Sequence, residues 1–296
     1  MAGYCRDCFT GTVETDGTHL GSEQELHGRP TYVSTPSADV QPLGTIVIIP
    51  DAFGWTFPNT RSLADSYARR VPCTVLLPDF MNGNALPART LTLMDYQPPP
   101  SDFRITRLLK RTWSILQVIP SLVRYLLTCR HALAQPRILS YLRSVRTSTA
   151  PAPSKLGVVG FCWGGLYAVE LTHDAPENKV VVGGEEVDLV DCAFTAHPSL
   201  LTIPGDIEKV VKPLSVANGD DDSFMGRKGM VKLNDILDAK NGAAGEEVHE
   251  VVVFPGAEHG FGVRRDWRDA LQKECRDKCE DQAVAWFRRQ FAASQE

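Results

Sequence analysis

The sequence predicts an α/β fold, in which a mostly parallel sheet carries helices on both of its faces. Two observations lead to this prediction. Short apolar runs rich in β-branched residues recur along the 296-residue chain, and such runs are typical of strands buried on both faces. Several of them are followed by segments whose apolar residues recur at helical spacing. Strands that alternate with helices require crossover connections, which place the strands in parallel.

The elements follow one another in a regular order. Residues 30–36 alternate between two prolines, which favours an edge strand because proline donates no ladder hydrogen bond. Residues 45–50 are rich in β-branched side chains and predict a buried strand, and a helix with Leu63, Ala64 and Tyr67 at helical spacing follows. The remaining strands are expected at 73–78, 155–160, 189–196, 213–218 and 249–254, and the helices at about 59–70, 164–173 and about 266–291.

One segment, residues 101–147, interrupts this alternation. It is helix-friendly and is broken by Pro120 and Pro136, which predicts two or three helices inserted between strands. Its charge is one-sided, with nine lysines and arginines against Asp102 alone. A solvated helix face would explain these cations. A basic lid that attracts an anionic substrate, a carrier protein or a membrane surface would explain them as well.

Composition and charge limit the classes of function. The chain is 43% hydrophobic and contains no Ser/Gly-rich linker, so we expect a single domain spanning residues 1–296. A net charge of −5 gives no reason to expect a nucleic-acid partner. No apolar run predicts a membrane span or a signal segment, so we expect a cytoplasmic protein. A small-molecule partner is favoured, and a homodimer is left open.

The cysteines give no sign of a disulfide framework or a metal site. Eight cysteines are sparse for a chain of this length, and a cytosolic protein keeps them as thiols. Cys5 and Cys8 form a C-x-x-C pair, but no second pair lies at zinc-finger spacing, so we interpret the pair as incidental. Cys275 and Cys279 lie one helical turn apart and are expected to pack in a core. We therefore expect no metal and no other cofactor.

The strongest local signal is the motif Gly160-Phe161-Cys162-Trp163-Gly164. It lies between a predicted strand and a predicted helix, and its glycines stand two residues either side of Cys162. This is the pattern of a nucleophile on a tight strand-to-helix turn. A helix N-terminus stabilises a thiolate, so the position would itself activate the cysteine. The alternative is a small buried thiol on a glycine-rich turn.

A thiol nucleophile needs a base, which in this fold is a histidine placed after the last strand. His259 follows the strand predicted at residues 249–254 and lies in a glycine-rich loop. His197 also ends a predicted strand, but it comes too early in the chain for this role. We interpret His197 as a residue that lines the pocket or belongs to a loop.

The base needs an acid that holds its tautomer, expected after the penultimate strand. Asp220, Asp221 and Asp222 all lie there, and spacing favours Asp222, while the other two fit a solvated turn. A calcium site is disfavoured because consecutive side chains cannot converge on one ion. Oxyanion donors are expected from the backbone N–H of Trp163 and from a second N–H after the first buried strand, at Ala52 or Phe53.

The pattern resembles the dienelactone hydrolase family within the α/β-hydrolase superfamily, and in particular its fungal branch. The resemblance covers most of the chain outside 101–147. It rests on the residues Pro50-Asp51-Ala52-Phe53-Gly54-Trp55, Leu77-Pro78-Asp79-Phe80, Gly157-Val158-Val159-Gly160-Phe161-Cys162-Trp163-Gly164-Gly165, Gly219-Asp220-Asp221-Asp222-Ser223-Phe224 and His259-Gly260-Phe261.

The resemblance implies an α/β-hydrolase fold and a Cys-Asp-His triad at Cys162, Asp222 and His259. The chain departs from the family at three places. Asp51 stands where bacterial members carry a glutamate that partners the resting thiol, and residues 80–83 lack the family arginine that grips a substrate carboxylate. A second family arginine, four residues after the histidine, falls on Val263, with Arg264 one place later.

These residues predict a hydrolase that cleaves an ester, lactone or thioester bond of a small molecule by acyl transfer to water. Two alternatives are left open. One is a non-hydrolytic or offloading enzyme of a fungal biosynthetic pathway, acting as a cyclase, isomerase or thioesterase. The other is a non-enzymatic binding protein that uses the cleft and the basic segment.

Overall fold

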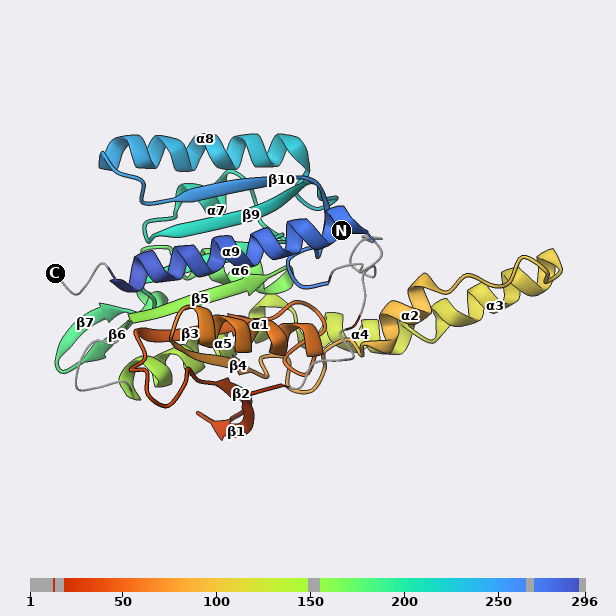
Figure 1. Cartoon of the computed structure of the whole chain (residues 1–296), viewed down its shortest axis with the longest axis horizontal. Helices are drawn as coiled ribbons and strands as arrows, with labels where there is room; N and C mark the ends of the chain where they lie inside the picture. Colours follow the sequence, from red (N-terminus) through yellow and green to blue (C-terminus); the bar gives the residue numbers. More distant parts are fainter. Residues whose placement is uncertain (1–12, 14–18, 149–154, 265–268, 293–296) are drawn as a thin grey trace.

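The computed structural model describes residues 13, 19–148, 155–264 and 269–292. Its main sheet has eight strands in the order β1-β2-β4-β3-β5-β8-β9-β10, shown in Figure 1. From β4 to β10 neighbouring strands are parallel, whereas β1, β2 and β4 pair antiparallel. The strands are β1 Ser22–Leu26, β2 Arg29–Ser34, β3 Gly44–Ile49, β4 Thr74–Pro78, β5 Lys155–Phe161, β8 Cys192–Ala196, β9 Leu214–Asp221 and β10 Glu250–Glu258.

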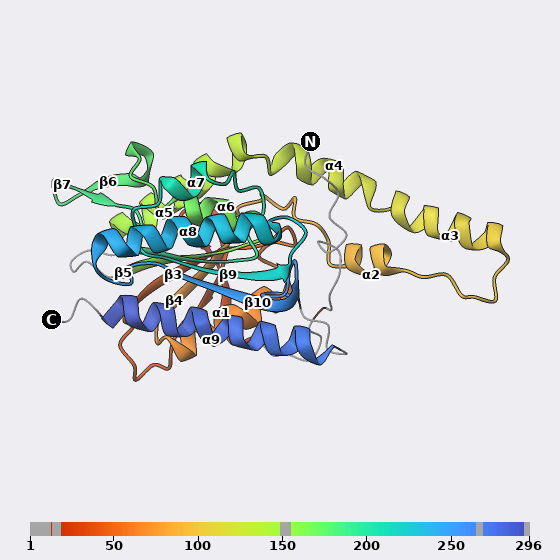
Figure 2. The ribbon, with the colours of Figure 1, turned by 90° about the horizontal axis from the view of Figure 1, so that it is seen from above.

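Helices cover both faces of this sheet, as the sequence predicts. Figure 2 shows α1 and α9 on one side and α5, α6 and α8 on the other. Strand β3 explains how one strand serves both faces: Ile46 and Ile48 pack with α1 and α9, while Val47 and Ile49 pack with α5 and α6. The helices are α1 Pro58–Arg70, α2 Arg89–Asp95, α3 Arg104–Leu116, α4 Ile119–Thr128, α5 His131–Ser148, α6 Trp163–Glu170, α7 Gly205–Glu208, α8 Gly226–Ala244 and α9 Ala270–Ala292.

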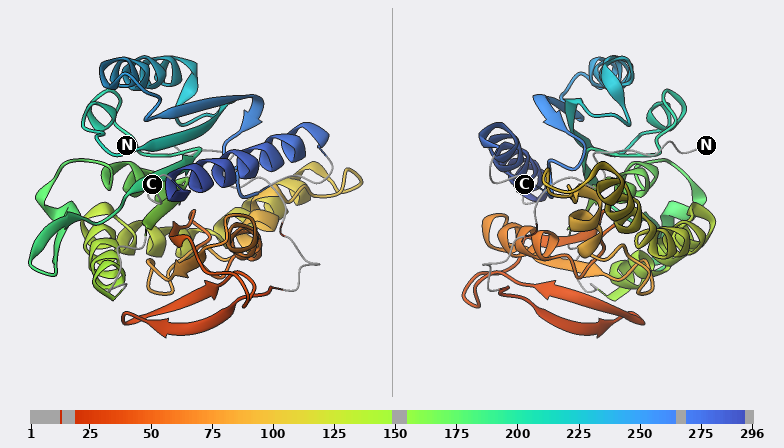
Figure 3. Two further views of the ribbon diagram at one scale, coloured as in Figure 1. Left: turned by 60° about the vertical axis from the view of Figure 1, so that its left-hand side comes forward. Right: turned by 90° about the vertical axis from the view of Figure 1, so that its right-hand side faces the viewer.

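The prediction that residues 30–36 form an edge strand is wrong. The β1–β2 hairpin closes that side of the sheet, and β1 is its outer strand (Figure 3). Strand β1 is largely exposed and polar, so its residues carry no buried-strand pattern. Helices α2 and α8 were not predicted from the sequence, and neither was a separate hairpin of β6 Lys179–Val182 with β7 Glu185–Asp188.

Residues 101–147 form three helices between β4 and β5, which confirms the predicted two or three helices, but they are not one insertion. Helix α5 is a crossover helix between β4 and β5, and it buries Ile138, Leu142 and Val145 in the core. Pro136 lies inside α5 and does not break it, whereas Pro120 lies in the first turn of α4. Of this segment, α3 and the start of α4 extend away from the sheet, and the preceding helix α2 lies beside them (Figures 1 and 2).

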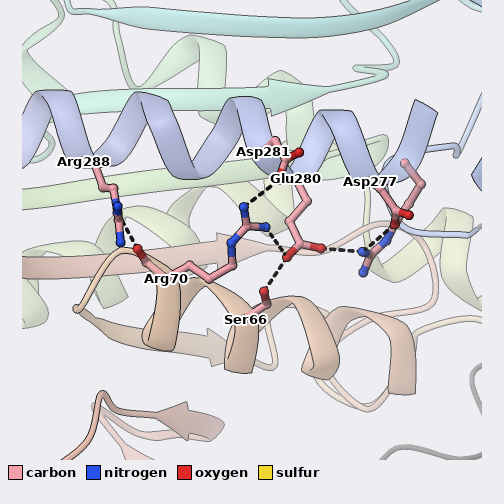
Figure 4. A network of polar contacts seen from close by, with 7 residues as sticks. Ser66, Arg70, Asp277, Glu280, Asp281 and Arg288 are labelled. Carbon is pink, nitrogen blue, oxygen red and sulfur yellow. Dashed lines mark hydrogen bonds and ion pairs between the residues drawn. The ribbon is translucent and has the colours of Figure 1, made fainter. Parts of the chain in front are cut away.

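A polar network joins α1 to α9 (Figure 4). Glu280 of α9 accepts hydrogen bonds from Ser66, from Arg70 of α1 at 2.9 Å and from Arg276 one turn earlier. Arg70 also pairs with Asp281 at 2.5 Å. Burial raises the pKa of Glu280, but Arg276, Ser66 and Arg70 outweigh burial, so the pKa lies below its usual range. The carboxylate is therefore stabilised in the folded state.

Glu280→Ala should lower the free energy of unfolding by about 3 kcal/mol at neutral pH, because it removes the carboxylate that the buried Arg276 cation contacts. A group whose pKa is depressed on folding stabilises the protein above its unfolded pKa and loses that effect as the pH falls through its folded pKa. The penalty should therefore shrink in acid. Urea denaturation at neutral and acidic pH measures both effects. Asp281→Asn, at an exposed side chain, is the control and should change stability by at most about 1 kcal/mol.

Candidate active site

The turn between β5 and α6 holds Cys162 in a strained backbone conformation. Its φ is 50° and its ψ is −109°, a region that residues other than glycine rarely adopt. Glycines make the turn possible, since a Cβ on Gly160 would collide with the carbonyl of Gly164, and one on Gly164 would collide with that of Ile49. The turn therefore presents the cysteine side chain at the first turn of α6, as the motif predicts.

Cys162, His259 and Asp222 form a buried chain of contacts. The Cys162 Sγ lies 3.1 Å from Nε2 of His259, and Nδ1 of the same ring lies 2.9 Å from Oδ2 of Asp222. The side chains of His259 and Asp222 are fully buried. The contact from Nδ1 to the carboxylate fixes Nε2 toward the sulfur, so the imidazole is oriented to exchange a proton with the thiol.

The sheet brings these distant residues together. Asp222 directly follows β9 and His259 directly follows β10, and these strands are parallel neighbours. Their carboxyl ends meet at the same edge as the end of β5, where open parallel sheets place their sites. Asp220 instead accepts from the Gly256 N–H at 2.6 Å, and Asp221 is exposed. The spacing argument for Asp222 thus selects the aspartate that contacts the histidine.

The electrostatics of the site favour a protonated His259. Burial lowers the pKa of this ring, but the neighbouring Cys162 sulfur and the Asp222 carboxylate more than compensate and raise it to about 10. Each of these two neighbours can carry a negative charge next to the imidazolium. The sulfur, the imidazole and the carboxylate are thus held in contact and shielded from water.

His197 lies in the same site but differs electrostatically. It is fully buried with a φ of 40°, its ring packs edge-on to His259 at 5.0 Å between centroids, and it stacks on Phe161. Burial, partly opposed by the Cys162 sulfur, lowers the pKa of His197 to about 4. A ring that stays neutral at physiological pH fits a residue that lines the pocket. The expectation that it is not the base agrees with this environment.

Asp51 and Arg264 form a second buried pair beside the cysteine. Nε of Arg264 lies 3.5 Å from Oδ2 of Asp51, and both side chains are 1% exposed. Burial raises the pKa of Asp51 to about 6, with the Arg264 cation opposing that rise and the Cys162 sulfur adding to it. The guanidinium also lies over the Phe53 ring, 5.1 Å from its centroid, and a Cβ on Gly260 would collide with it. The arginine one place beyond the family position therefore still reaches the site.

The three expected oxyanion residues have different environments. The Phe53 N–H donates to Oδ1 of Asp51 at 3.0 Å, so it is already engaged. The Ala52 N–H donates no hydrogen bond to any described residue, and the Ala52 carbonyl accepts from Leu86. Trp163 is the first residue of α6, where backbone N–H groups have no partner within the helix. The backbone N–H groups of Ala52 and Trp163 are thus the two that remain available to donate to an oxyanion.

Helix α4 and the loop after β8 bring further residues close to Cys162 that were not predicted from the sequence. Tyr125 of α4 packs between both cores, and burial followed by the neighbouring Cys162 raises its pKa well above the usual range. The Trp163 indole donates to the Cys129 carbonyl at 3.0 Å and so ties the end of α4 to the turn between β5 and α6. The Ser199 hydroxyl lies 3.8 Å from the Cys162 sulfur. No sequence signal marks Tyr125, while Ser199 lies close behind a strand end.

Two other pairs of cysteines stand out in the sequence, Cys275 with Cys279 and Cys5 with Cys8. Cys275 and Cys279 are buried in the core on α9, which confirms their packing role. Cys5 and Cys8 lie outside the described residues. Within the described ranges, no three His, Cys, Asp or Glu side chains gather as a metal ion would require.

Comparison with known proteins identifies the family. Residues 30–291 match the model of the dienelactone hydrolase family. The hydrolase pyvD of Aspergillus violaceofuscus is 24% identical over 280 residues, covering 95% of this chain and 94% of the relative. The hydrolase tropI of Talaromyces stipitatus is 25% identical, with coverage of 95% and 94%. A carboxymethylenebutenolidase homolog of Xenopus tropicalis is 26% identical, with coverage of 83% and 80%.

Solved structures share the fold. A Klebsiella pneumoniae protein provisionally assigned as a dienelactone hydrolase superposes with a TM-score of 0.59 at 17% identity, covering 90% of this chain and 98% of the other. A propionate-bound esterase of Thermogutta terrifontis gives a TM-score of 0.54 at 16% identity, with coverage of 90% and 94%. Both comparisons show that the chain has the α/β-hydrolase fold. Because the family model matches the chain from β2 to α9, the chain belongs to the dienelactone hydrolase family.

Proposed function

We propose that this protein is a cysteine hydrolase that cleaves an ester, lactone or thioester bond of a small molecule through Cys162, His259 and Asp222. One observation carries the proposal. The sulfur, the imidazole and the carboxylate form a continuous buried chain of contacts at 3.1 and 2.9 Å on a strained strand-to-helix turn. A strained backbone and a buried ionisable pair both destabilise the folded state, and side-chain packing requires neither of them at this position.

The geometry supports a two-step acyl transfer. The Cys162 thiolate attacks the substrate carbonyl carbon, and the charge that develops on the carbonyl oxygen is stabilised by the N–H groups of Trp163 and Ala52. The tetrahedral intermediate collapses, its bond to the leaving alkoxide or thiolate breaks, and His259 donates its proton to that leaving group. Water, deprotonated by His259, then attacks the thioester on Cys162 and releases the acid. Asp222 holds the imidazole throughout.

The Asp51–Arg264 pair bears on the substrate class. A carboxylate bound beside Arg264 would have to compete with Asp51, which already lies at 3.5 Å from the guanidinium. Residues 80–83 offer no arginine in its place. We therefore propose a substrate without a carboxylate at this position, such as a neutral ester, lactone or thioester.

The similar proteins favour hydrolysis over the alternatives. The two fungal relatives and the Thermogutta structure are named as hydrolases or as an esterase, and the Xenopus relative as a homolog of a lactone hydrolase. A cyclase or isomerase of the same fold would release rearranged substrate and no acid. The nature of the product therefore separates the two readings.

The test is a panel of p-nitrophenyl esters, lactones and acyl thioesters, with acid product quantified for each. We expect acid release from at least one class. Rapid quenching followed by intact-mass analysis should show an added acyl mass that maps to Cys162. Turnover that yields only rearranged product, or an acyl group that maps to another residue, would contradict the proposal.

A further inference from the structure

Helix α3 and the start of α4 extend away from the sheet and turn an apolar face to solvent. Figures 1 and 2 show the pair running along the long axis of the molecule, with α2 alongside. The arrangement is the reverse of a normal surface helix, whose apolar stripe faces the core. In α3 the buried residue is Ser114, which is 4% exposed, whereas Trp113 beside it is 66% exposed.

The exposed apolar residues of α3 form one continuous face. At 100° per residue, the apolar side chains of α3 gather on roughly half of the helix circumference, and the basic ones share the other half with Ser114. Each of these apolar side chains is at least 38% exposed. They are Ile105, Leu108, Leu109, Trp113, Ile115 and Leu116.

This apolar face continues into α4. Only Gln117 and Val118 separate the two helices, and both have right-handed helical backbone angles. The spacing of three and four residues is therefore maintained across the junction. The exposed apolar residues of α4 are Ile119, Val123, Leu126 and Leu127. Together the two sets form what we call the α3–α4 face, which is larger in extent than the isolated apolar residues found on ordinary surfaces.

Cations border the α3–α4 face, in a protein whose net charge is −5. Residues 102–130 hold six lysines and arginines against one aspartate, Asp102, which pairs with Lys110 at 2.8 Å. Arg104, Arg107 and Arg130 have no carboxylate partner among the described residues. A solvated basic helix face would explain these arginines, but it would not explain an apolar face of ten exposed side chains beside them.

We propose that the α3–α4 face docks the protein on a membrane surface rich in anionic phospholipid. Helices that lie in the membrane interface combine a broad apolar face with aromatic residues and a basic polar face, and this pair has each of these features. No helix within the described ranges is long and apolar enough to cross a bilayer, so the helices would lie along the surface. A second copy is a poorer occupant, because joining two such faces brings their uncompensated cations together.

Docking would position the site at the membrane. The same α4 that carries Leu126 and Leu127 also carries Tyr125 beside Cys162, and its end at Cys129 is tied to Trp163. The inference rests on the α3–α4 face alone and holds whether or not Cys162 is a nucleophile. Cys162→Ser should therefore bind membranes like the wild type.

Co-sedimentation with vesicles tests the proposal. Wild type should bind phosphatidylcholine vesicles that contain phosphatidylserine and should bind pure phosphatidylcholine far more weakly, with binding reduced by added salt. Leu108→Ser/Leu109→Ser should weaken binding about tenfold or more for each leucine that is no longer buried in lipid. Arg104→Gln/Arg107→Gln should weaken it about fivefold per charge. Val231→Ser, at an exposed valine of α8, is the matched control and should bind normally.

Tryptophan fluorescence provides a second readout. Trp113 is the tryptophan of the α3–α4 face and is 66% exposed, so burial of this face in lipid should give a blue shift that is reduced in Trp113→Phe. Equal binding to neutral and anionic vesicles, or none to either, would overturn the proposal. So would a dimer in analytical ultracentrifugation that Leu108→Ser/Leu109→Ser dissociates, since the face would then be an interface between two copies.

Discussion

Cys162→Ala is expected to lower kcat for a small activated ester by a factor on the order of 10⁴ to 10⁶, the range found when the nucleophile of an acyl-transfer triad is removed. The substrate loses the covalent route, and His259 loses the group that it activates. Because Cys162 is only 4% exposed and alanine is smaller, the fold should persist. The measurement is steady-state hydrolysis, with circular dichroism and the denaturation midpoint recorded for the same sample.

Cys192→Ala is the matched control for that result. Cys192 is another buried thiol in the sheet, on β8 next to β5, the strand that Cys162 directly follows, and burial holds its pKa well above the usual range. It should lose some stability and little activity. Hydrolysis by Cys162→Ala within about tenfold of wild type would contradict the nucleophile assignment, since a factor of ten is worth only about 1.4 kcal/mol of barrier.

The three residues of the candidate triad could be predicted from the sequence because each is tied to a strand end. The carboxyl ends of parallel strands meet at one edge of the sheet, so Cys162, Asp222 and His259 converge whatever the details of the loops. The glycine spacing around Cys162 adds a local requirement that few other functions impose. Local pattern and topology therefore sufficed for these positions.

Other features depend on long-range packing that no local pattern encodes. Tyr125 reaches the site from the basic segment, where nothing in its neighbours distinguishes it from an exposed tyrosine. Helix α5 reads like the rest of residues 101–147, yet it packs on the sheet because it has to connect β4 to β5 in parallel. Strand β1 is polar except for Leu26 at its end, and its place in the sheet depends on pairing with β2. The position of Tyr125, the packing of α5 on the sheet and the existence of β1 were missed because contacts with other elements, and not the local sequence, determine them.

Asp222→Asn is expected to lower kcat by a factor on the order of 10⁴ while the binding pocket is preserved, as the corresponding change does in a serine triad. The amide keeps an oxygen for the Phe224 N–H, which donates to Oδ1 at 2.8 Å, so the turn after β9 should hold. Its NH₂ group would then face Nδ1 of His259 and force the proton onto Nε2, the atom that must accept from Cys162. The pKa of His259 should fall because one of its stabilising charges is gone.

Thiol reactivity separates this effect from a loss of structure. In wild type the imidazolium should make Cys162 react with iodoacetamide near pH 7 faster than free cysteine, and Asp222→Asn should bring the rate close to that of the free thiol. Asp221→Asn, one residue earlier and exposed, should leave both the alkylation rate and kcat unchanged. If Asp222→Asn slowed hydrolysis while alkylation of Cys162 stayed fast, the carboxylate would be positioning the ring for proton transfer without contributing to the thiolate. If it changed neither rate, the contact at 2.9 Å would be structural, and the base would work without an acid behind it.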